Sequence, residues 1–245
     1  ITYRTRDDVL DADRGAQVVW VPLLAYARYV DDPELNSHIV DLREYYRDVQ
    51  RGTLPSVAYI APSGNSEHPP GSIQAGERFV RSLLNELMKS SAWDSSAFLW
   101  SYDDWGGWYD HVKPPQVDKF GYGFRVPALL VSAFAKRGYV DHTTLDFTSA
   151  LKFIETNWGV EPLASRDAAA NNLLGAFDFD SPPRAAQILD ESRVSVATVR
   201  PTVQWVYLGY AVIVIAALGL LWLAARRRRP DVGVSDRIDP QESPL

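Results

Sequence analysis

Apolar residues recur along the chain in blocks that predict alternating helices and strands. From Pro22 to Tyr46 they follow a helical pattern, with a break expected at Asp32-Pro33 because proline disfavours a helical residue before it. From Phe79 to Met88 they repeat at three-and-four spacing, and Ser72 is a candidate N-cap for that helix. Phe147–Trp158 predicts a further helix.

Three apolar, β-rich runs predict strands, of which the first two are expected to be buried. They are Leu54–Ala61, Ala97–Tyr102 and Val126–Ser132. The loop from Pro62 to Gly71, which follows the first run, is dense in turn-forming residues. Strands that alternate with helices predict an α/β fold whose sheet is at least partly parallel.

The segment from Val206 to Ala225 predicts one C-terminal transmembrane helix. Its 20 residues carry no charge, and at helical rise they span roughly 30 Å, the thickness of the hydrocarbon core. Trp205 and Trp222 lie near its ends, where aromatic belts form. The basic run Arg226–Arg229 follows at once and predicts a cytoplasmic C-terminus.

These features divide the chain into four expected parts. Residues 1–180 form a globular domain, and residues 181–202 form a linker that is either a stalk or a segment held against the surface. Residues 203–225 form the membrane helix, and residues 226–245 form a short, disordered cytoplasmic tail. We therefore expect a single-pass protein of the cell membrane whose N-terminal domain lies outside the cytoplasm.

Composition and charge exclude some classes of partner and site. The net charge is −6, and no Lys/Arg stripe appears outside the one arginine run, so we expect no nucleic-acid partner. The absence of cysteine excludes disulfides and thiolate metal sites. Eight Trp and twelve Tyr fit either contact with carbohydrate or lipid, or large core side chains.

The strongest chemical signal is the stretch YDDWGGWYDH, which begins at Tyr102. Asp103 and Asp104 follow a predicted strand, and ligands of open α/β sheets bind beyond the carboxyl ends of strands. Adjacent carboxylates repel each other unless a cation or proton neutralises them, and their hard oxygens suit a divalent metal. The glycines allow a sharp turn close to a ligand. A solvated acidic turn is the alternative.

Two histidine-containing loops are weaker candidates. His68, in the stretch NSEHPP, follows the first predicted strand and would reach the same sheet edge as Asp103, where it could contact a phosphoryl oxygen or act as acid or base. Glu67 would orient His68 or be solvated. His142 follows the third strand close to Lys136, although a solvated basic turn is the more ordinary interpretation.

Together with the motifs above, the sequence of residues 54–180 resembles a bacterial phosphoesterase family. This family includes the non-specific phospholipases C and a respiratory-burst-inhibiting acid phosphatase. Six blocks match in order: LPSVAYIAP, SEHPP, IQAGERFV, SAWDSSAFLWSYDDWGGWYDHVKPP, GFRVPALLVSAFAKRGYVDH and SALKFIETNWGV. The resemblance implies an alkaline-phosphatase-like sheet with flanking helices, of which residues 1–180 would be the C-terminal part.

The resemblance also implies roles for individual residues. The paired acidic metal ligands fall on Asp103 and Asp104, although the family usually has Glu at the second position, one methylene longer. The histidine that meets the phosphoryl group falls on His68. His111 lies in the DHV block, where it would brace the metal loop as part of the catalytic set. The cofactor is then a divalent metal ion, with Ca, Mg, Mn and Zn all open.

The resemblance implies that the chain is a membrane-anchored, metal-dependent hydrolase of phosphate esters, of the phospholipase C or acid phosphatase type. Its substrate would be a phospholipid or a soluble monoester. The family's N-terminal ENRSFDH-like motif and its hydroxyl nucleophile have no counterpart in this sequence. We therefore expect the chain alone to be inactive. The alternative is a non-catalytic, membrane-tethered binding module.

Overall fold

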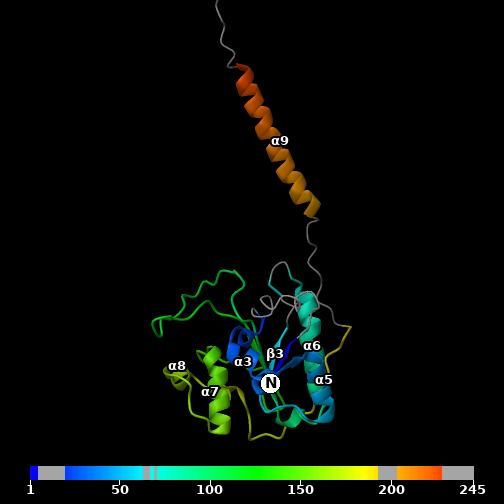
Figure 1. Ribbon diagram of the computed structural model, residues 1–245, viewed down its shortest axis with the longest axis vertical. Coiled ribbons are helices and arrows are strands. Elements are labelled where there is room, and N and C mark those ends of the chain that lie inside the picture. The colour runs from blue at the N-terminus through cyan, green and yellow to red at the C-terminus, as the bar shows by residue number, and fades with distance from the viewer. Residues whose placement is uncertain (5–19, 63–66, 69–70, 193–202, 228–245) are drawn as a thin grey trace, which may run out of the picture. The chain divides into compact units, whose positions relative to one another are not determined.

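The computed structural model describes residues 1–4, 20–62, 67–68, 71–192 and 203–227 (Figure 1). The chain divides into two compact units, Ile1–Ser195 and Val196–Leu245. The first unit is a mixed α/β structure with a parallel sheet and flanking helices, as the alternation of the elements predicts.

The first sheet is parallel, with the strand order β2-β1-β3. Its strands are β1 (Thr2–Arg4), β2 (Ile39–Asp41) and β3 (Tyr59–Ala61). Tyr3 of β1 is completely buried in a core with Tyr45, Val49 and Leu83. The strand predicted over residues 54–61 is too long, because only its last three residues pair with β1. Pro55 lacks an N–H donor for a sheet ladder.

The interrupted helical segment predicted over residues 22–46 is confirmed in part, because that stretch and its continuation to Arg51 divide into several short helices and one unexpected strand. In order they are η1 (Pro22–Ala25), α3 (Ala27–Asp31), α4 (Pro33–Asn36), β2 and α5 (Leu42–Arg51). The predicted break at Asp32-Pro33 is present, and the Asp32 carboxylate accepts hydrogen bonds from the first turn of α4. Asp41 likewise caps α5. Between these caps the chain pairs with β1, which no local pattern indicates.

The two other predicted helices are confirmed. α6 (Ile73–Lys89) begins after Ser72, whose hydroxyl accepts a hydrogen bond from the Ala75 N–H at 3.3 Å. α7 (Phe147–Trp158) is capped by Asp146. α6 lies beside α5 on one flank of the strands (Figure 1), and the Tyr45 hydroxyl donates to the Leu83 carbonyl at 3.0 Å between them.

The second and third predicted strands pair with each other rather than with the first sheet. β4 (Ala97–Ser101) and β5 (Ala128–Ser132) are antiparallel, with Leu99 opposite Leu130. Phe98 of β4 packs against both hydrophobic cores of the first unit. Leu99 of β4 is exposed, so the prediction that this strand is buried is wrong. From Ala97 to Trp100 of β4 the side chains alternate between an exposed face and a half-buried face.

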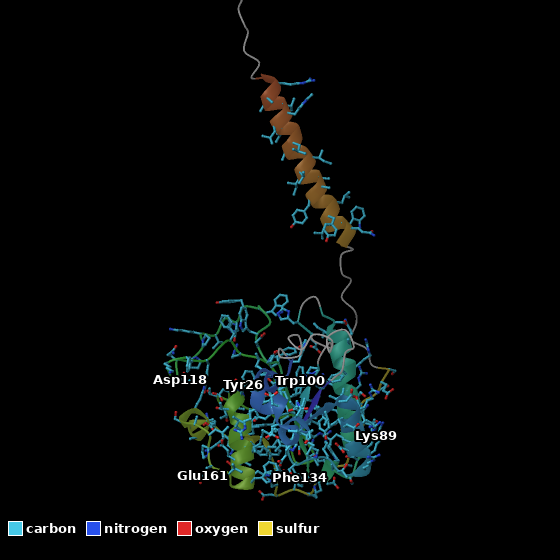
Figure 2. The ribbon with its side chains drawn as sticks, in the orientation of Figure 1. Tyr26, Lys89, Trp100, Asp118, Phe134 and Glu161 are labelled. Atoms are coloured by element: carbon cyan, nitrogen blue, oxygen red, sulfur yellow. The ribbon has the colours of Figure 1, made fainter. Side chains whose placement is uncertain are left out.

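A long connection runs from β4 to β5 and carries the DD and DH motifs; it is drawn in green in Figure 1. Asp118, labelled in Figure 2, lies in this connection and forms an ion pair of 3.2 Å with Arg166 of α8 (Ser165–Ala169). The Arg166 guanidinium also donates to the Gly121 carbonyl at 3.0 Å and lies over the Tyr122 ring. These contacts attach the connection to α8.

The end of the first unit is held against its surface. The remaining short elements are η2 (Trp93–Ser95) and η3 (Leu173–Ala176). The segment that follows η3 is bound to earlier parts of the chain. The Asn85 side chain exchanges hydrogen bonds with the backbone of Leu189, and the Trp93 indole donates to the Arg184 carbonyl. The described part of the expected linker, up to residue 192, is therefore held against the surface of the first unit by these contacts.

The second unit contains α9 (Val203–Arg227). This helix is long and apolar enough to cross a membrane from Gln204 to Arg226, in agreement with the predicted position. Arg228, Arg229 and the predicted disordered tail lie outside the described residues. The orientation of α9 stays a prediction.

Candidate functional site

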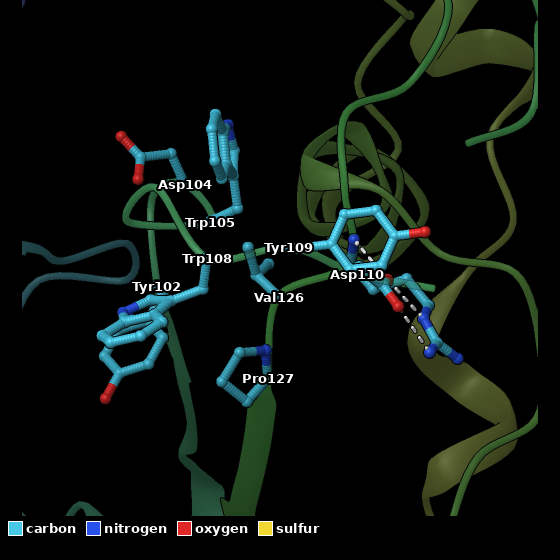
Figure 3. Close-up of a pocket in the computed structure, with 9 residues that line it drawn as sticks. Tyr102, Asp104, Trp105, Trp108, Tyr109, Asp110, Val126 and Pro127 are labelled. Atoms are coloured by element: carbon cyan, nitrogen blue, oxygen red, sulfur yellow. Dashed lines mark hydrogen bonds and ion pairs between the residues drawn. The ribbon is translucent and has the colours of Figure 1, made fainter. Parts of the chain in front are cut away.

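An open pocket of about 510 Å³ lies where β4 ends and β5 begins (Figure 3). Both ends of the long connection line it, so the pocket brings together the DD motif, the DH motif and the residues that lead into β5. Its lining residues are Tyr102, Asp104, Trp105, Trp108, Tyr109, Asp110, Arg125, Val126 and Pro127.

A tight turn at two glycines shapes the first side of the pocket. Gly106 and Gly107 have φ values of 61° and 82°, a left-handed conformation that side chains disfavour. One Asp104 carboxylate oxygen, Oδ1, accepts a hydrogen bond from the Gly106 N–H at 2.5 Å. The Trp108 N–H donates to the Trp105 carbonyl at 3.0 Å. The DDWGG sequence therefore folds back on itself and holds Asp104 at the pocket.

Asp103 and Asp104 are both exposed at the end of β4. The Asp103 Oδ1 atom accepts a hydrogen bond from the Asp104 N–H at 3.1 Å. These adjacent carboxylates offer hard oxygen ligands, which divalent cations such as Mg²⁺ and Ca²⁺ prefer. Across the described ranges there is no cluster of three or more His, Asp or Glu side chains that could hold a metal ion. Asp103 and Asp104 therefore fit part of a coordination shell, and other groups would complete it.

Asp110 and Arg125 form a bidentate ion pair at the pocket. The Arg125 guanidinium donates from Nε to one Asp110 oxygen at 2.8 Å and from an Nη atom to the other at 2.9 Å (Figure 3). The Val112 N–H donates to the same carboxylate. The Arg125 side-chain hydrogen bonds, followed by the Val112 N–H, hold the pKa of the Asp110 carboxyl well below its usual range. No sequence pattern indicated this bidentate pair, which joins the DHV and FRVP blocks.

This contact predicts how stability depends on acidity. A carboxyl whose pKa is lowered in the folded state stabilises the fold at pH values above the pKa that this carboxyl has in the unfolded chain, which is about 3.9. The contribution is lost as the pH falls from there towards the lower folded pKa. We expect the free energy of unfolding, measured with urea in detergent micelles from pH 6 to pH 2, to fall less steeply in Asp110→Asn and in Arg125→Gln. A wild-type slope in either variant would contradict the prediction.

His111 is on the solvent side of this contact. Its Nδ1 atom lies 3.7 Å from an Asp110 oxygen, and its side chain is 84% exposed. It does not line the pocket. Its predicted catalytic role stays a prediction, and in the structure Arg125 braces the loop.

The loop that contains His68 is attached to the end of β4. The Tyr102 hydroxyl donates to the Glu67 carboxylate at 2.5 Å. Burial and then this carboxylate raise the pKa of Tyr102 to about 12. Glu67 precedes His68 and Tyr102 precedes Asp103, so the bond joins the chain neighbours of two predicted site residues. His68 is exposed in a bend, and Glu67 is held rather than solvated.

The basic turn near His142 serves the fold. The Lys136 ammonium donates to the Gly175 carbonyl at 2.7 Å and lies 5.0 Å from the centre of the Tyr139 ring. The Asp141 carboxylate accepts a hydrogen bond from the Thr143 N–H at 2.9 Å. These contacts agree with an ordinary surface turn.

Comparisons with known proteins bear on the whole pocket. Phospholipase C B of Mycobacterium tuberculosis strain CDC 1551 is 30% identical over 182 residues, which are 62% of this chain and 35% of the relative. Non-hemolytic phospholipase C of Burkholderia pseudomallei is 33% identical over 173 residues, 56% of this chain and 24% of the relative. Non-specific phospholipase C6 of Arabidopsis thaliana is 31% identical over 156 residues, 53% of this chain and 30% of the relative.

The chain spans between about a quarter and a third of the length of these curated relatives. The family model described as "Phosphoesterase family" matches residues 20–161, a stretch that includes every residue of the pocket. Because this match covers more than half of the sequence, the chain belongs to the phosphoesterase family.

Proposed function

We propose that the intact protein, meaning this chain with any sequence that flanks it in its gene, is a metal-dependent hydrolase of phosphoric esters anchored in a membrane by α9. The observation that carries the proposal is the pocket at the end of β4, which gathers the acidic motifs inside the family match. Relatives named phospholipase C support a phosphoester substrate. An alkaline-phosphatase-like architecture of the whole catalytic domain is part of the same proposal.

The proposed chemistry assigns separate tasks to the two loops. Asp103 and Asp104 would hold a divalent cation, which supplies positive charge to stabilise the phosphoryl oxygens. His68 would donate a hydrogen bond or a proton to the phosphoryl group, because histidine is a common acid and base in catalysis. Arg125 would keep Asp110 in place at the far side of the pocket. The hydroxyl nucleophile is proposed to come from sequence that flanks this chain in the intact protein.

Exposed aromatic side chains around the pocket support a phospholipid as the substrate. Trp108 and Tyr109 line the pocket and are 71% and 83% exposed, and Phe120 in the same connection is 77% exposed. Trp and Tyr rings are enriched where a protein surface meets lipid head groups, and a phenyl ring adds apolar area that lipid can bury. A rim of this kind would bring the acidic loop close to a bilayer.

Comparing two substrates tests this proposal. We expect Phe120→Ala to lower the hydrolysis of phosphatidylcholine in vesicles about fivefold, because partial burial of one phenyl ring in lipid is worth about 1 kcal/mol. Hydrolysis of a soluble phosphate monoester should not change, and a chelator should stop both reactions. Leu163→Ala, which truncates another exposed apolar side chain, is the control. Equal loss on both substrates would show that Phe120 supports the loop rather than lipid contact.

The proposed topology follows from the charge beside α9. Arg226–Arg229 place the C-terminal end of the helix in the cytoplasm, so the first unit would lie outside. We expect protease added to spheroplasts to digest residues 1–200 and to spare an epitope tag placed after Leu245. Digestion of the tag with survival of the first unit would reverse the orientation.

A further inference from the structure

One hydrogen bond connects the loop of His68 with the loop of Asp103. The Tyr102 hydroxyl, at the end of β4, donates to the Glu67 carboxylate at 2.5 Å. Figure 3 shows this hydroxyl pointing away from Asp104, so it does not face the acidic side of the pocket. Along the chain the bonded residues are 35 positions apart, yet each directly precedes a proposed site residue.

The Glu67 carboxylate occupies a space that α6 leaves free for it. Gly76, the buried fourth residue of α6, carries no Cβ, and a Cβ placed there would lie 1.9 Å from Glu67 Oε1 and 2.5 Å from its Cδ. The backbone at Gly76 is helical, so no special φ requires glycine. A glycine inside a helix costs about 1 kcal/mol relative to alanine. The space for Glu67 is the structural reason for this glycine.

We propose that Gly76, Glu67 and Tyr102 are positioning residues that set the distance between His68 and Asp103. Gly76 provides the space, Glu67 fills it, and Tyr102 anchors Glu67 to the end of β4. The inference rests on the proposed function of His68 and Asp103. None of the three residues needs to touch the reacting atoms. Their effect is geometric, and a displacement of about 1 Å in a catalytic group can lower a rate about 100-fold.

Gly76→Ala is the most direct test in the intact protein. The new methyl group displaces the Glu67 side chain, and we expect kcat to fall roughly 10- to 100-fold with little change in KM. The helix itself favours alanine, so the midpoint of thermal unfolding should not fall. Loss of activity without loss of stability separates a positioning role from a merely structural one.

Variants that remove the hydrogen bond between Tyr102 and Glu67 should have non-additive effects on kcat. Tyr102→Phe and Glu67→Ala should each lower kcat about as much as Gly76→Ala, and the double variant should be no worse than either single one. Glu67→Gln keeps an oxygen acceptor and should retain most of kcat. Tyr3→Phe is the matched control, because it removes a tyrosine–carboxylate hydrogen bond of 2.7 Å to Asp48 in the core. It should leave kcat unchanged.

A second measurement does not depend on activity. The chain has four histidines, so the His68 ring signals can be assigned in an NMR spectrum of the chain in detergent micelles by comparison with His68→Gln. We expect Gly76→Ala and Tyr102→Phe to shift the His68 signals and to leave those of His38 and His142 in place. Unchanged His68 signals, or a wild-type kcat in Tyr102→Phe, would overturn the inference. An intact wild-type protein without phosphoesterase activity would refute the proposed function instead, and the NMR result would still decide the positioning.

Discussion

Asp103→Asn is expected to lower phosphoester hydrolysis by the intact protein roughly 10²–10³-fold, the scale on which loss of one electrostatic stabiliser acts. The substitution removes one carboxylate charge from the proposed metal pair and keeps the shape of the side chain. Metal content, measured by inductively coupled plasma mass spectrometry, should fall together with kcat. Asp118→Asn is the matched control, because it neutralises a carboxylate in the same connection that pairs with Arg166 outside the pocket.

Asp104→Asn tests the second half of the pair. The amide oxygen of asparagine can still accept the Gly106 N–H, so the glycine turn should persist while one ligand charge is lost. We expect a loss of metal and rate comparable to that of Asp103→Asn. Full metal content and full rate would show that Asp104 only stabilises the turn. Asp104→Glu restores the residue that the family usually has at this position, and it should bind metal at least as tightly as the wild type.

His68→Ala is expected to lower kcat of the intact protein roughly 10²–10⁴-fold, the usual contribution of a positioned acid, base or charge-stabilising group. His68 is exposed in a bend, so its removal should change the free energy of unfolding by no more than about 0.5 kcal/mol. Steady-state kinetics and urea unfolding of the same preparation measure both quantities.

His142→Ala is the control for His68, because it removes another exposed imidazole from a loop. We expect its kcat to match the wild type. A near-normal kcat in His68→Ala would show that the residue is ordinary loop surface. A crystal structure with His68 turned away from Asp103 would lead to the same conclusion.

The elements that the sequence predicted well are those whose signals are local. α6 and α7 have apolar residues at helical spacing together with caps at Ser72 and Asp146, and α9 has a long uncharged run. The glycine turn after Asp104 is local in the same sense, because Gly106 and Gly107 permit its left-handed backbone. A few neighbouring residues suffice to determine each of these features.

The strand pairings depend on residues far apart in the sequence. β2 lies in a stretch with a helical apolar pattern, and it forms a strand because Ile39–Asp41 pair with β1. The sequence predicted strands close to β4 and β5 but not their antiparallel pairing. A pattern of apolar residues reports burial along one segment and contains no information about which strand lies beside it.

The same distinction separates the residues of the site from the contacts that support them. The sequence by itself placed Asp103, Asp104 and His68 in loops at strand ends, because each follows an apolar, β-rich run and has turn-forming residues beside it. Only the tertiary structure decided that Tyr102 binds Glu67 and that Arg125 binds Asp110, 35 and 15 positions apart. Such contacts form when folding brings distant side chains together, and their energy depends on a geometry that no single segment specifies.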